Sequence, residues 1–193
     1  MDTSSIIEER LRGRPRRRIE RAYRAAVLVP ILTEGGPDRL LLTRRSEDLP
    51  THQGQVAFPG GSISPSDAGA VEAALREARE EIGLDPGAAE VLGLLDDFTT
   101  WDGRIAVTPV AARIAGTPAF EPHTGEVARI FEIPVDELAR PGRWTWRPDP
   151  VRGEGRRLWY FEHDGETLWG LSARIVIQLL ELAGLPSPRP GGR

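Results

Sequence analysis

The chain has 193 residues, of which 39% are hydrophobic and 28% charged, as expected for one globular domain with a single core. It contains no cysteine, all 25 of its basic residues are arginine, and its net charge is −4. These counts exclude disulfides, thiolate metal sites, a cysteine nucleophile, Schiff-base chemistry and a phosphate-loop lysine. We expect a cytoplasmic protein without membrane or nucleic-acid partners, because no apolar leader or spanning segment is present and the net charge is negative.

The first 24 residues are dense in arginine, and Gly13 and Pro15 interrupt helical structure there. We therefore expect a solvated arm over residues 1–24, with a contact to substrate or RNA as the alternative. The folded domain is predicted over residues 25–185. Proline, glycine and arginine dominate residues 186–193, which predicts a disordered tail.

Segments rich in aliphatic and β-branched residues predict strands. They are residues 25–32, 39–43, 90–98, 104–114 and 126–134. Pro134 would open a short helical turn, and Asp164-Gly165 between two aromatic runs predicts a hairpin. The apolar spacing of residues 171–185 predicts a helix that stops at Gly184.

The stretch FPGGSISPSDAGAVEAALREAREEIGL, residues 58–84, predicts a glycine-rich turn followed by a helix. Ser66 or Asp67 would cap the helix after Pro65, and Gly83 would end it. Spacings of three and four residues predict its buried stripe. The stripe consists of Val71, Ala74, Leu75, Ala78 and Ile82.

Three glutamates of this helix, Glu77, Glu80 and Glu81, follow the spacing i, i+3 and i+4, so their carboxylates converge and repel one another. A hard divalent ion would reverse that repulsion, because oxygen ligands suit Mg²⁺ or Mn²⁺ completed by water and substrate phosphate. Arg76, one turn before Glu80, could orient that carboxylate. Gly61 lets the backbone approach a metal or phosphate closely. The plainer alternative is a glycine turn before an acidic surface helix.

The segment Arg76-Glu77-Ala78-Arg79-Glu80-Glu81-Ile82-Gly83-Leu84 matches the motif R-E-U-x-E-E-x-G-U, in which U is aliphatic or small. The chain therefore resembles the Nudix hydrolases. The resemblance implies a fold of class α+β, an α/β/α sandwich with a mixed central sheet, and metal-dependent cleavage of nucleoside diphosphates linked to another moiety. The first half of the motif departs from G-x5-E-x7-R-E. Counted from Gly61, the arginine comes one residue late, and Asp67 lies near the place of the expected glutamate.

A second resemblance covers residues 41–61, LLTRRSEDLPTHQGQVAFPGG. This segment is similar to the signature L-L-T-x-R-x4-R-x3-G-x3-F-P-G-G of the coenzyme A pyrophosphatase branch, with Pro50 where arginine is frequent. The segment LWGLSA, residues 168–173, is similar to that branch's aromatic-Gly-Thr-Ala element. The implied reaction is hydrolysis of coenzyme A or acyl-CoA to adenosine 3′,5′-bisphosphate and 4′-phosphopantetheine or its acyl form.

The resemblance also implies roles for individual residues. Glu77, Glu80, Glu81 and the Gly61 carbonyl would hold Mg²⁺ or Mn²⁺. Arg76, Glu77 and Glu126 are the expected catalytic residues, with Glu77 or Glu126 as the general base. A solvated charge at the end of a strand is the alternative for Glu126.

The expected substrate-binding residues are Arg44, Arg45, His52, Gln55 and Trp101. The two arginines could pair with phosphates, including the 3′-phosphate of coenzyme A. Trp101 could stack on adenine or line the pantetheine channel. A surface arginine and a partly buried loop tryptophan are the alternatives, and His52 and Gln55 lie inside the 41–61 signature.

Two other functions stay open. One is a Nudix pyrophosphatase that cleaves ADP-ribose, NADH or dinucleoside polyphosphates, against which the 41–61 signature counts. The other is a noncatalytic nucleotide-binding module, which the presence of all three glutamates disfavours. An RNA-decapping role has only the arginine-rich arm in its favour. The expected partner is a small-molecule nucleotide, and the sequence leaves open whether the protein is a monomer or a homodimer.

Overall fold

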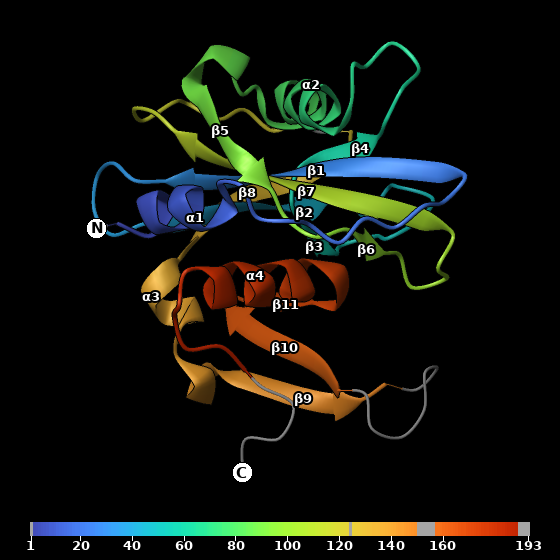
Figure 1. The fold of residues 1–193 in the computed structure, drawn as a ribbon. Coiled ribbons are helices and arrows are strands. Elements are labelled where there is room, and N and C mark those ends of the chain that lie inside the picture. The colour runs from blue at the N-terminus through green and yellow to red at the C-terminus, as the bar shows by residue number, and fades with distance from the viewer. Residues whose placement is uncertain (1, 124, 150–156, 189–193) are drawn as a thin grey trace.

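A computed structural model describes residues 2–123, 125–149 and 157–188, and within them a mixed sheet of eight strands forms the centre (Figure 1). Strands β3, β2, β1, β7 and β5 lie side by side in this order, while β8 pairs with β2, β4 with β1 and β6 with β7. The strands are β1 (Tyr23–Leu32), β2 (Arg39–Arg45), β3 (Val56–Ala57), β4 (Gly60–Ser62), β5 (Ala89–Leu94), β6 (Phe98–Thr99), β7 (Ile105–Ile114) and β8 (Val127–Pro134). Strands β1 and β7 run parallel, whereas the pairs around them are antiparallel. The predicted mixed sheet is confirmed.

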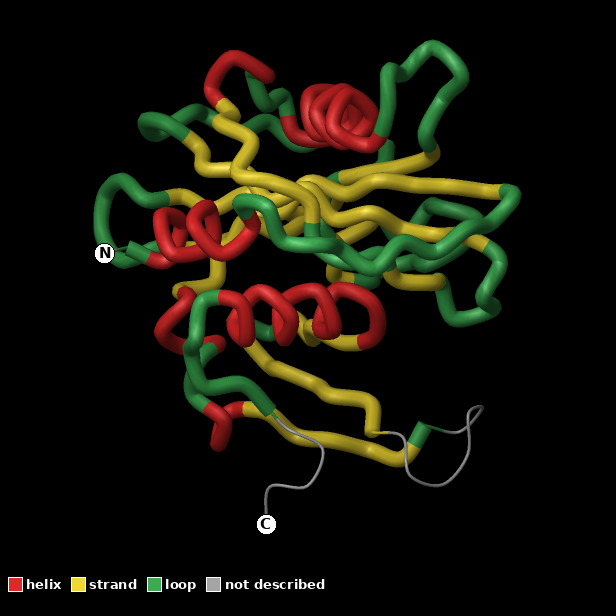
Figure 2. The backbone as a smooth tube through the Cα atoms, in the orientation of Figure 1, coloured by secondary structure: helices red, strands yellow, loops and turns green. Residues whose placement is uncertain are grey.

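Helices lie on both faces of this sheet, as the tube in Figure 2 shows. Helix α2 (Ala70–Ile82) covers one face, and α4 (Gly170–Leu182) covers the other, where α1 (Thr3–Leu11) packs beside it. Beyond α4 lies an antiparallel sheet of β9 (Trp144–Pro148), β10 (Arg157–His163) and β11 (Glu166–Trp169), reached through the short helix α3 (Val135–Leu138). Two 3-10 turns cover Pro86–Ala88 and Pro141–Arg143. The layers confirm the predicted α+β sandwich.

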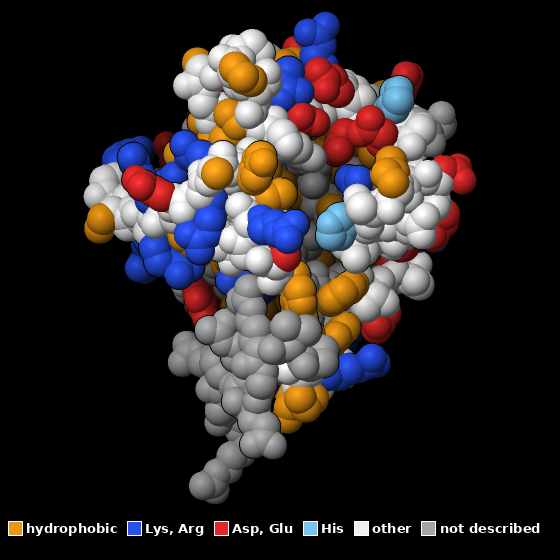
Figure 3. All heavy atoms as spheres, turned by 90° about the vertical axis from the view of Figure 1, so that its right-hand side faces the viewer, with side chains coloured by type: hydrophobic (Ala, Val, Ile, Leu, Met, Phe, Trp, Pro, Cys, Tyr) orange, Lys and Arg blue, Asp and Glu red, His pale blue; other side chains and the backbone are white. Residues whose placement is uncertain are grey.

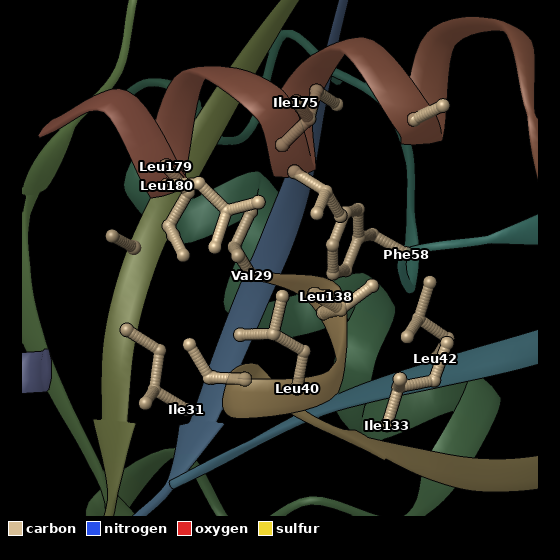
Figure 4. Packing of buried hydrophobic residues seen from close by; sticks show 14 of the residues in the cluster. Val29, Ile31, Leu40, Leu42, Phe58, Ile133, Leu138, Ile175, Leu179 and Leu180 are labelled. Carbon is tan, nitrogen blue, oxygen red and sulfur yellow. The ribbon is translucent and has the colours of Figure 1, made fainter. Parts of the chain in front are cut away.

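Two hydrophobic clusters hold the layers together. The cluster under α4 contains Leu40 and Leu42 of β2, and Figure 4 shows them with Val29, Ile175 and Leu179. The cluster under α2 contains Leu41, because successive residues of a strand point to opposite faces. No helix of the described residues is long and apolar enough to span a membrane.

The N-terminal residues do not form the expected solvated arm. Ile7 of α1 is completely buried, and Leu11 belongs to the same cluster under α4. The arginines that follow bond to Asp96 and Asp97, so the segment is held against the sheet instead of extending into solvent. The expectation failed because it counted the charges and overlooked the apolar face of a short helix. The domain limits at residues 25 and 185 stay a prediction.

Several predicted turns and caps can be compared with the structure. Gly83 ends α2 in the left-handed conformation, with φ 68°, and the hairpin at Asp164-Gly165 joins β10 to β11, so both predictions are confirmed. The predicted N-caps Ser66 and Asp67 are wrong, because the helix begins after Gly69 and its N-cap makes no side-chain bond. In the predicted tail, Ser187 is buried, while residues 189–193 lie outside the described residues.

Candidate active site

The backbone of Gly60 and Gly61 in strand β4 lies against the acidic face of α2. The Gly60 N–H donates a hydrogen bond of 3.2 Å to Oε2 of Glu81. A Cβ atom at Gly61 would lie 2.5 Å from the carboxyl carbon of Glu77, so the glutamate occupies the space that any other residue would need. Gly61 therefore allows the strand to pass directly under the Glu77 carboxylate, whereas a Cβ atom at Gly60 would meet the backbone of β1 at Ala26 and Val27.

The guanidinium of Arg76 joins three carboxylates. Its Nη1 donates to Glu77 at 2.8 Å and to Glu80 at 3.2 Å, while Nε and Nη2 donate to the two carboxylate oxygens of Asp67 at 3.0 and 3.1 Å. Nη2 also bonds to the Ser62 carbonyl at 3.1 Å. Arg76 thereby ties the loop after β4 to the acidic face of the helix.

These bonds change the ionisation of both groups. The pKa of Asp67 lies below its ordinary value, first because Arg76 donates to its carboxylate and next because the Ser64 N–H does. The pKa of Arg76 is raised by Asp67 and then by Glu77. The sequence offered Asp67 as a helix cap or a displaced motif residue, and only the fold shows that it binds Arg76.

Glu81 is the buried carboxylate of the group, with 5% of its surface exposed. Burial raises its pKa to about 7. The Gly60 N–H and the charge of Arg45 oppose this rise, whereas the charges of Glu77 and Glu126 add to it. The predicted stripe omitted Glu81, because a glutamate at this depth contradicts the pattern of an amphipathic helix.

The loop that follows β7 brings Glu126 close to Glu81. The His123 N–H donates to the Glu81 carbonyl at 2.9 Å, and the Ser46 N–H donates to the Glu126 carbonyl at 2.8 Å. Glu126 itself is exposed. Residues far apart in the sequence are thus gathered at one end of the sheet. Figure 3 views that end and shows acidic side chains collected at the height of α2.

Arg44 and Arg45 point to opposite faces of the sheet. Strand alternation places Arg44 on the side of Leu42, which packs under α4, and Arg45 on the side of α2. The influence of Arg45 on the pKa of Glu81 agrees with this assignment. The structure therefore brings Arg45, but not Arg44, to the side of the carboxylates.

The other three expected substrate-binding residues lie in two loops. The Gln55 carbonyl accepts the Arg45 N–H at 3.0 Å, and the Gln55 side chain lies 3.0 Å from Nδ1 of the exposed His52. Trp101 lies in the turn between β6 and β7, with 42% of its surface exposed. His52 and Gln55 therefore belong to the loop that flanks Arg45, and Trp101 belongs to a separate loop.

The chemistry of these residues fits a hard divalent ion. Glu77, Glu80 and Glu81 offer carboxylate oxygens beside the backbone of Gly61. In the described part of the chain, no three acidic or histidine side chains are already gathered as metal ligands. Arg76 donates hydrogen bonds to two of these carboxylates, Glu77 and Glu80. The donor atoms are thus of the kind that such an ion binds, and their present partners are the Arg76 guanidinium for Glu77 and Glu80 and the Gly60 N–H for Glu81.

Comparison with known proteins identifies the class of protein to which this chain belongs. Residues 22–152 match the NUDIX domain model. An uncharacterized Nudix hydrolase NudL from Pectobacterium atrosepticum is 40% identical over 171 residues, which cover 88% of each chain. The NudL protein of Escherichia coli K12 is 40% identical over 155 residues, or 80% of each chain.

Two solved structures share the fold. The Nudix hydrolase RenU from M. smegmatis is 24% identical with a TM-score of 0.51, and the match covers 63% of this chain and 76% of that one. A MutT/nudix family protein from Enterococcus faecalis is 17% identical, also with a TM-score of 0.51, and the match covers 90% and 71%. The chain belongs to the Nudix family. It is a Nudix hydrolase, an enzyme that acts on pyrophosphate bonds, and enzymes of this family generally use divalent metal ions.

Proposed function

We propose that the protein hydrolyses the pyrophosphate of coenzyme A or acyl-CoA. The observation that carries this proposal is the 41–61 segment, which is similar to the coenzyme A pyrophosphatase signature at every specified position except Pro50. Its position supports the proposal, because the segment contributes Gly60, whose N–H donates to Glu81, and Arg45, whose charge lowers the pKa of Glu81. A signature that selects a substrate is expected to border the reacting groups in this way.

The carboxylates would hold the metal. We assign Glu77, Glu80 and Glu81 as ligands of Mg²⁺ or Mn²⁺, together with the Gly61 carbonyl. When bound, such an ion supplies charge neutralisation at the bridging phosphates and an oriented water. Arg76 donates hydrogen bonds to the carboxylates of Glu77 and Glu80 and so orients them, and it is a positioning residue in this scheme.

The reaction adds water to one phosphorus and breaks its bond to the bridging oxygen. The bridging oxygen leaves on the other phosphate, and the proton lost by the water must reach a base. Glu77 and Glu126 remain the candidates for that base. Glu126 is exposed beside Glu81 and can pass a proton to solvent, whereas Glu77 also accepts a hydrogen bond from Arg76. The products would be adenosine 3′,5′-bisphosphate and 4′-phosphopantetheine or its acyl form.

The substrate would lie along the loops that flank Arg45. We assign Arg45 to a phosphate, since it faces the carboxylates, and His52, Gln55 and Trp101 to the remaining substrate contacts. Arg44 can take part only from the opposite face of the sheet. The buried Nε atoms of Arg44 and Arg45 both lack a hydrogen-bond partner among the described residues, so the face alone distinguishes the two arginines. We therefore expect the loss of Arg45 to weaken turnover more than the loss of Arg44.

The test is a substrate panel with product identification by mass. The purified protein is incubated with coenzyme A, dephospho-coenzyme A, ADP-ribose, NADH and diadenosine polyphosphates, in Mg²⁺, Mn²⁺ or EDTA. We expect metal-dependent release of adenosine 3′,5′-bisphosphate from coenzyme A and its loss in Glu80→Gln. Glu181→Gln, an exposed glutamate of α4, is the matched control. Preferred cleavage of another substrate would refute the coenzyme A assignment, and tight nucleotide binding without turnover would favour a binding module.

A further inference from the structure

One flank of helix α2 carries apolar side chains that the sheet does not bury. The sequence placed Val71 and Leu75 in the buried stripe, but both are only half-buried in the structure. Successive residues lie about 100° apart around a helix, so a helix that buries Ala74 and Glu81 turns Val71 and Leu75 to its flank. The buried residues of α2 are Ala73, Ala74, Ala78, Glu81 and Ile82.

A hollow of about 850 Å³ lies along this flank. Val71 and Leu75 of α2 line it together with Pro86 of the first 3-10 turn and Leu94 of β5. Strand β5 ends the order of strands in the sheet, and α2 is the outermost layer on its face, so the hollow opens at the surface (Figure 1). Apolar side chains that line a surface hollow are typical of a binding face.

Two exposed, opposite charges lie on the same side of the helix as Leu75. Glu72 is in the first turn of α2 and Arg79 in the last. Seven residues separate them, so they lie about two turns, or about 10 Å, apart along the axis, with Leu75 near the midpoint. Among the described residues, the Arg79 guanidinium has no hydrogen-bond or ion-pair partner. The helix dipole favours these two charges but does not account for the half-exposed leucine between them.

This pattern is complementary to its own reverse. When two copies of α2 pack antiparallel with Leu75 near a two-fold axis, Glu72 of each copy faces Arg79 of the other, and the two leucines meet. We propose that the hollow binds a second copy of this chain in such a two-fold dimer. A ligand with a single charge would use only one end of the pattern, whereas a second copy pairs both ends twice.

The dimer leaves the carboxylate side of α2 open. Gly61 lies against Glu77, which is about 200° around the helix from Leu75. A partner on the hollow therefore does not cover the place where the strand meets the carboxylates. The helix has 13 residues and is about 20 Å long, so the interface is small and the dissociation constant should be micromolar.

Sedimentation velocity over the micromolar concentration range tests the dimer. Arg79→Glu and Glu72→Arg each place like charges opposite one another at both ends of the contact, so each should weaken the wild-type dimer about tenfold. The double variant Glu72→Arg/Arg79→Glu exchanges the charges and should restore most of the affinity. Arg10→Glu makes the same change in the last turn of α1 and should leave the dimer intact. Thermal melting of each variant checks that it is folded.

A disulfide experiment locates the axis. The chain contains no cysteine, so a single introduced thiol reports only on its own position. Leu75→Cys should form a disulfide-linked dimer in oxidised glutathione, because the two residues meet at the axis. Arg10→Cys is the control and should not form this species under the same conditions.

A wild type that stays monomeric throughout the micromolar range would exclude a second copy as the occupant of the hollow. A double variant that dimerises as weakly as the two single variants would overturn the pairing of Glu72 with Arg79. Equal cross-linking of Leu75→Cys and Arg10→Cys would contradict an axis at Leu75.

Discussion

Two clusters of arginine and carboxylate lie on this sheet, and their charge balance differs. Around Asp96 and Asp97, Arg14 donates to the Asp96 carboxylate and Arg16 to the Asp97 carboxylate, while the Arg17 guanidinium donates to the Asp97 backbone carbonyl. Around Arg76, one guanidinium bonds to three carboxylates, and the buried Glu81 adds a fourth acidic group. The first cluster is balanced by the chain itself, whereas the second has an excess of negative charge that the described residues do not neutralise.

We infer from this difference that the first cluster is a structural set of ion pairs and that the second is arranged for a ligand. Asp97 accepts bonds from Arg16, the Ile19 N–H and the Thr108 hydroxyl, so its buried charge is well satisfied. Glu81 is nearly as buried but receives one backbone N–H, and its pKa rises to about 7. A cation at the second cluster would remove this penalty. Changes there should affect catalysis, and changes at the first cluster should affect folding.

The largest expected effect is on catalysis. Glu81→Gln should lower kcat by a factor of about 10²–10⁴, because the buried group then lacks the charge that a metal ligand needs. The measurement is turnover of the substrate found in the panel, at saturating metal. At neutral pH the variant should remain as stable as the wild type, since a glutamine in this position has no ionisation cost. A variant that keeps full activity would show that Glu81 does not serve the reaction.

The next effect is on stability. Asp97→Asn should lower the free energy of unfolding by about 3 kcal/mol, because it leaves the largely buried Arg16 without its carboxylate partner. Urea unfolding measures the loss. Glu90→Gln breaks the more exposed pair with Arg113 and should cost less than about 1 kcal/mol. Equal losses in the two variants would contradict the structural role assigned to the Asp97 cluster.

The sequence predicted the periodic parts of the molecule and missed the contacts between distant segments. Strands β1 and β7 and the end of α2 at Gly83 follow from alternation, spacing and glycine, which are local properties. The three glutamates follow from a short motif. The bond between Asp67 and Arg76 depends on tertiary packing, so no local pattern indicates it. The apolar face of α1 is a local pattern, but the surface that buries Ile7 is set by the fold.

A third prediction uses the pKa of Glu81 in metal-free protein. Its folded-state pKa is raised from 4.5 to about 7, so this group favours the folded state most below pH 4.5 and loses that contribution as the pH rises through 7. Relative to Glu81→Gln, the wild type should lose up to about 3 kcal/mol between pH 4 and 8. Unfolding in EDTA at several pH values measures this difference. A difference that does not change with pH would contradict the raised pKa.

The smallest expected effect concerns Asp67, which belongs to the acidic cluster without being a proposed metal ligand. Asp67→Asn should lower kcat about tenfold and raise the metal concentration needed for half-maximal activity, because Arg76 would no longer be held by two charged bonds. Asp67→Glu keeps the charge. Its side chain is longer by one methylene, as is that of the glutamate that the motif G-x5-E-x7-R-E has near this place. We therefore expect Asp67→Glu to retain more activity than Asp67→Asn. If both variants lost the same activity, the shape of the loop and not its charge would position Arg76.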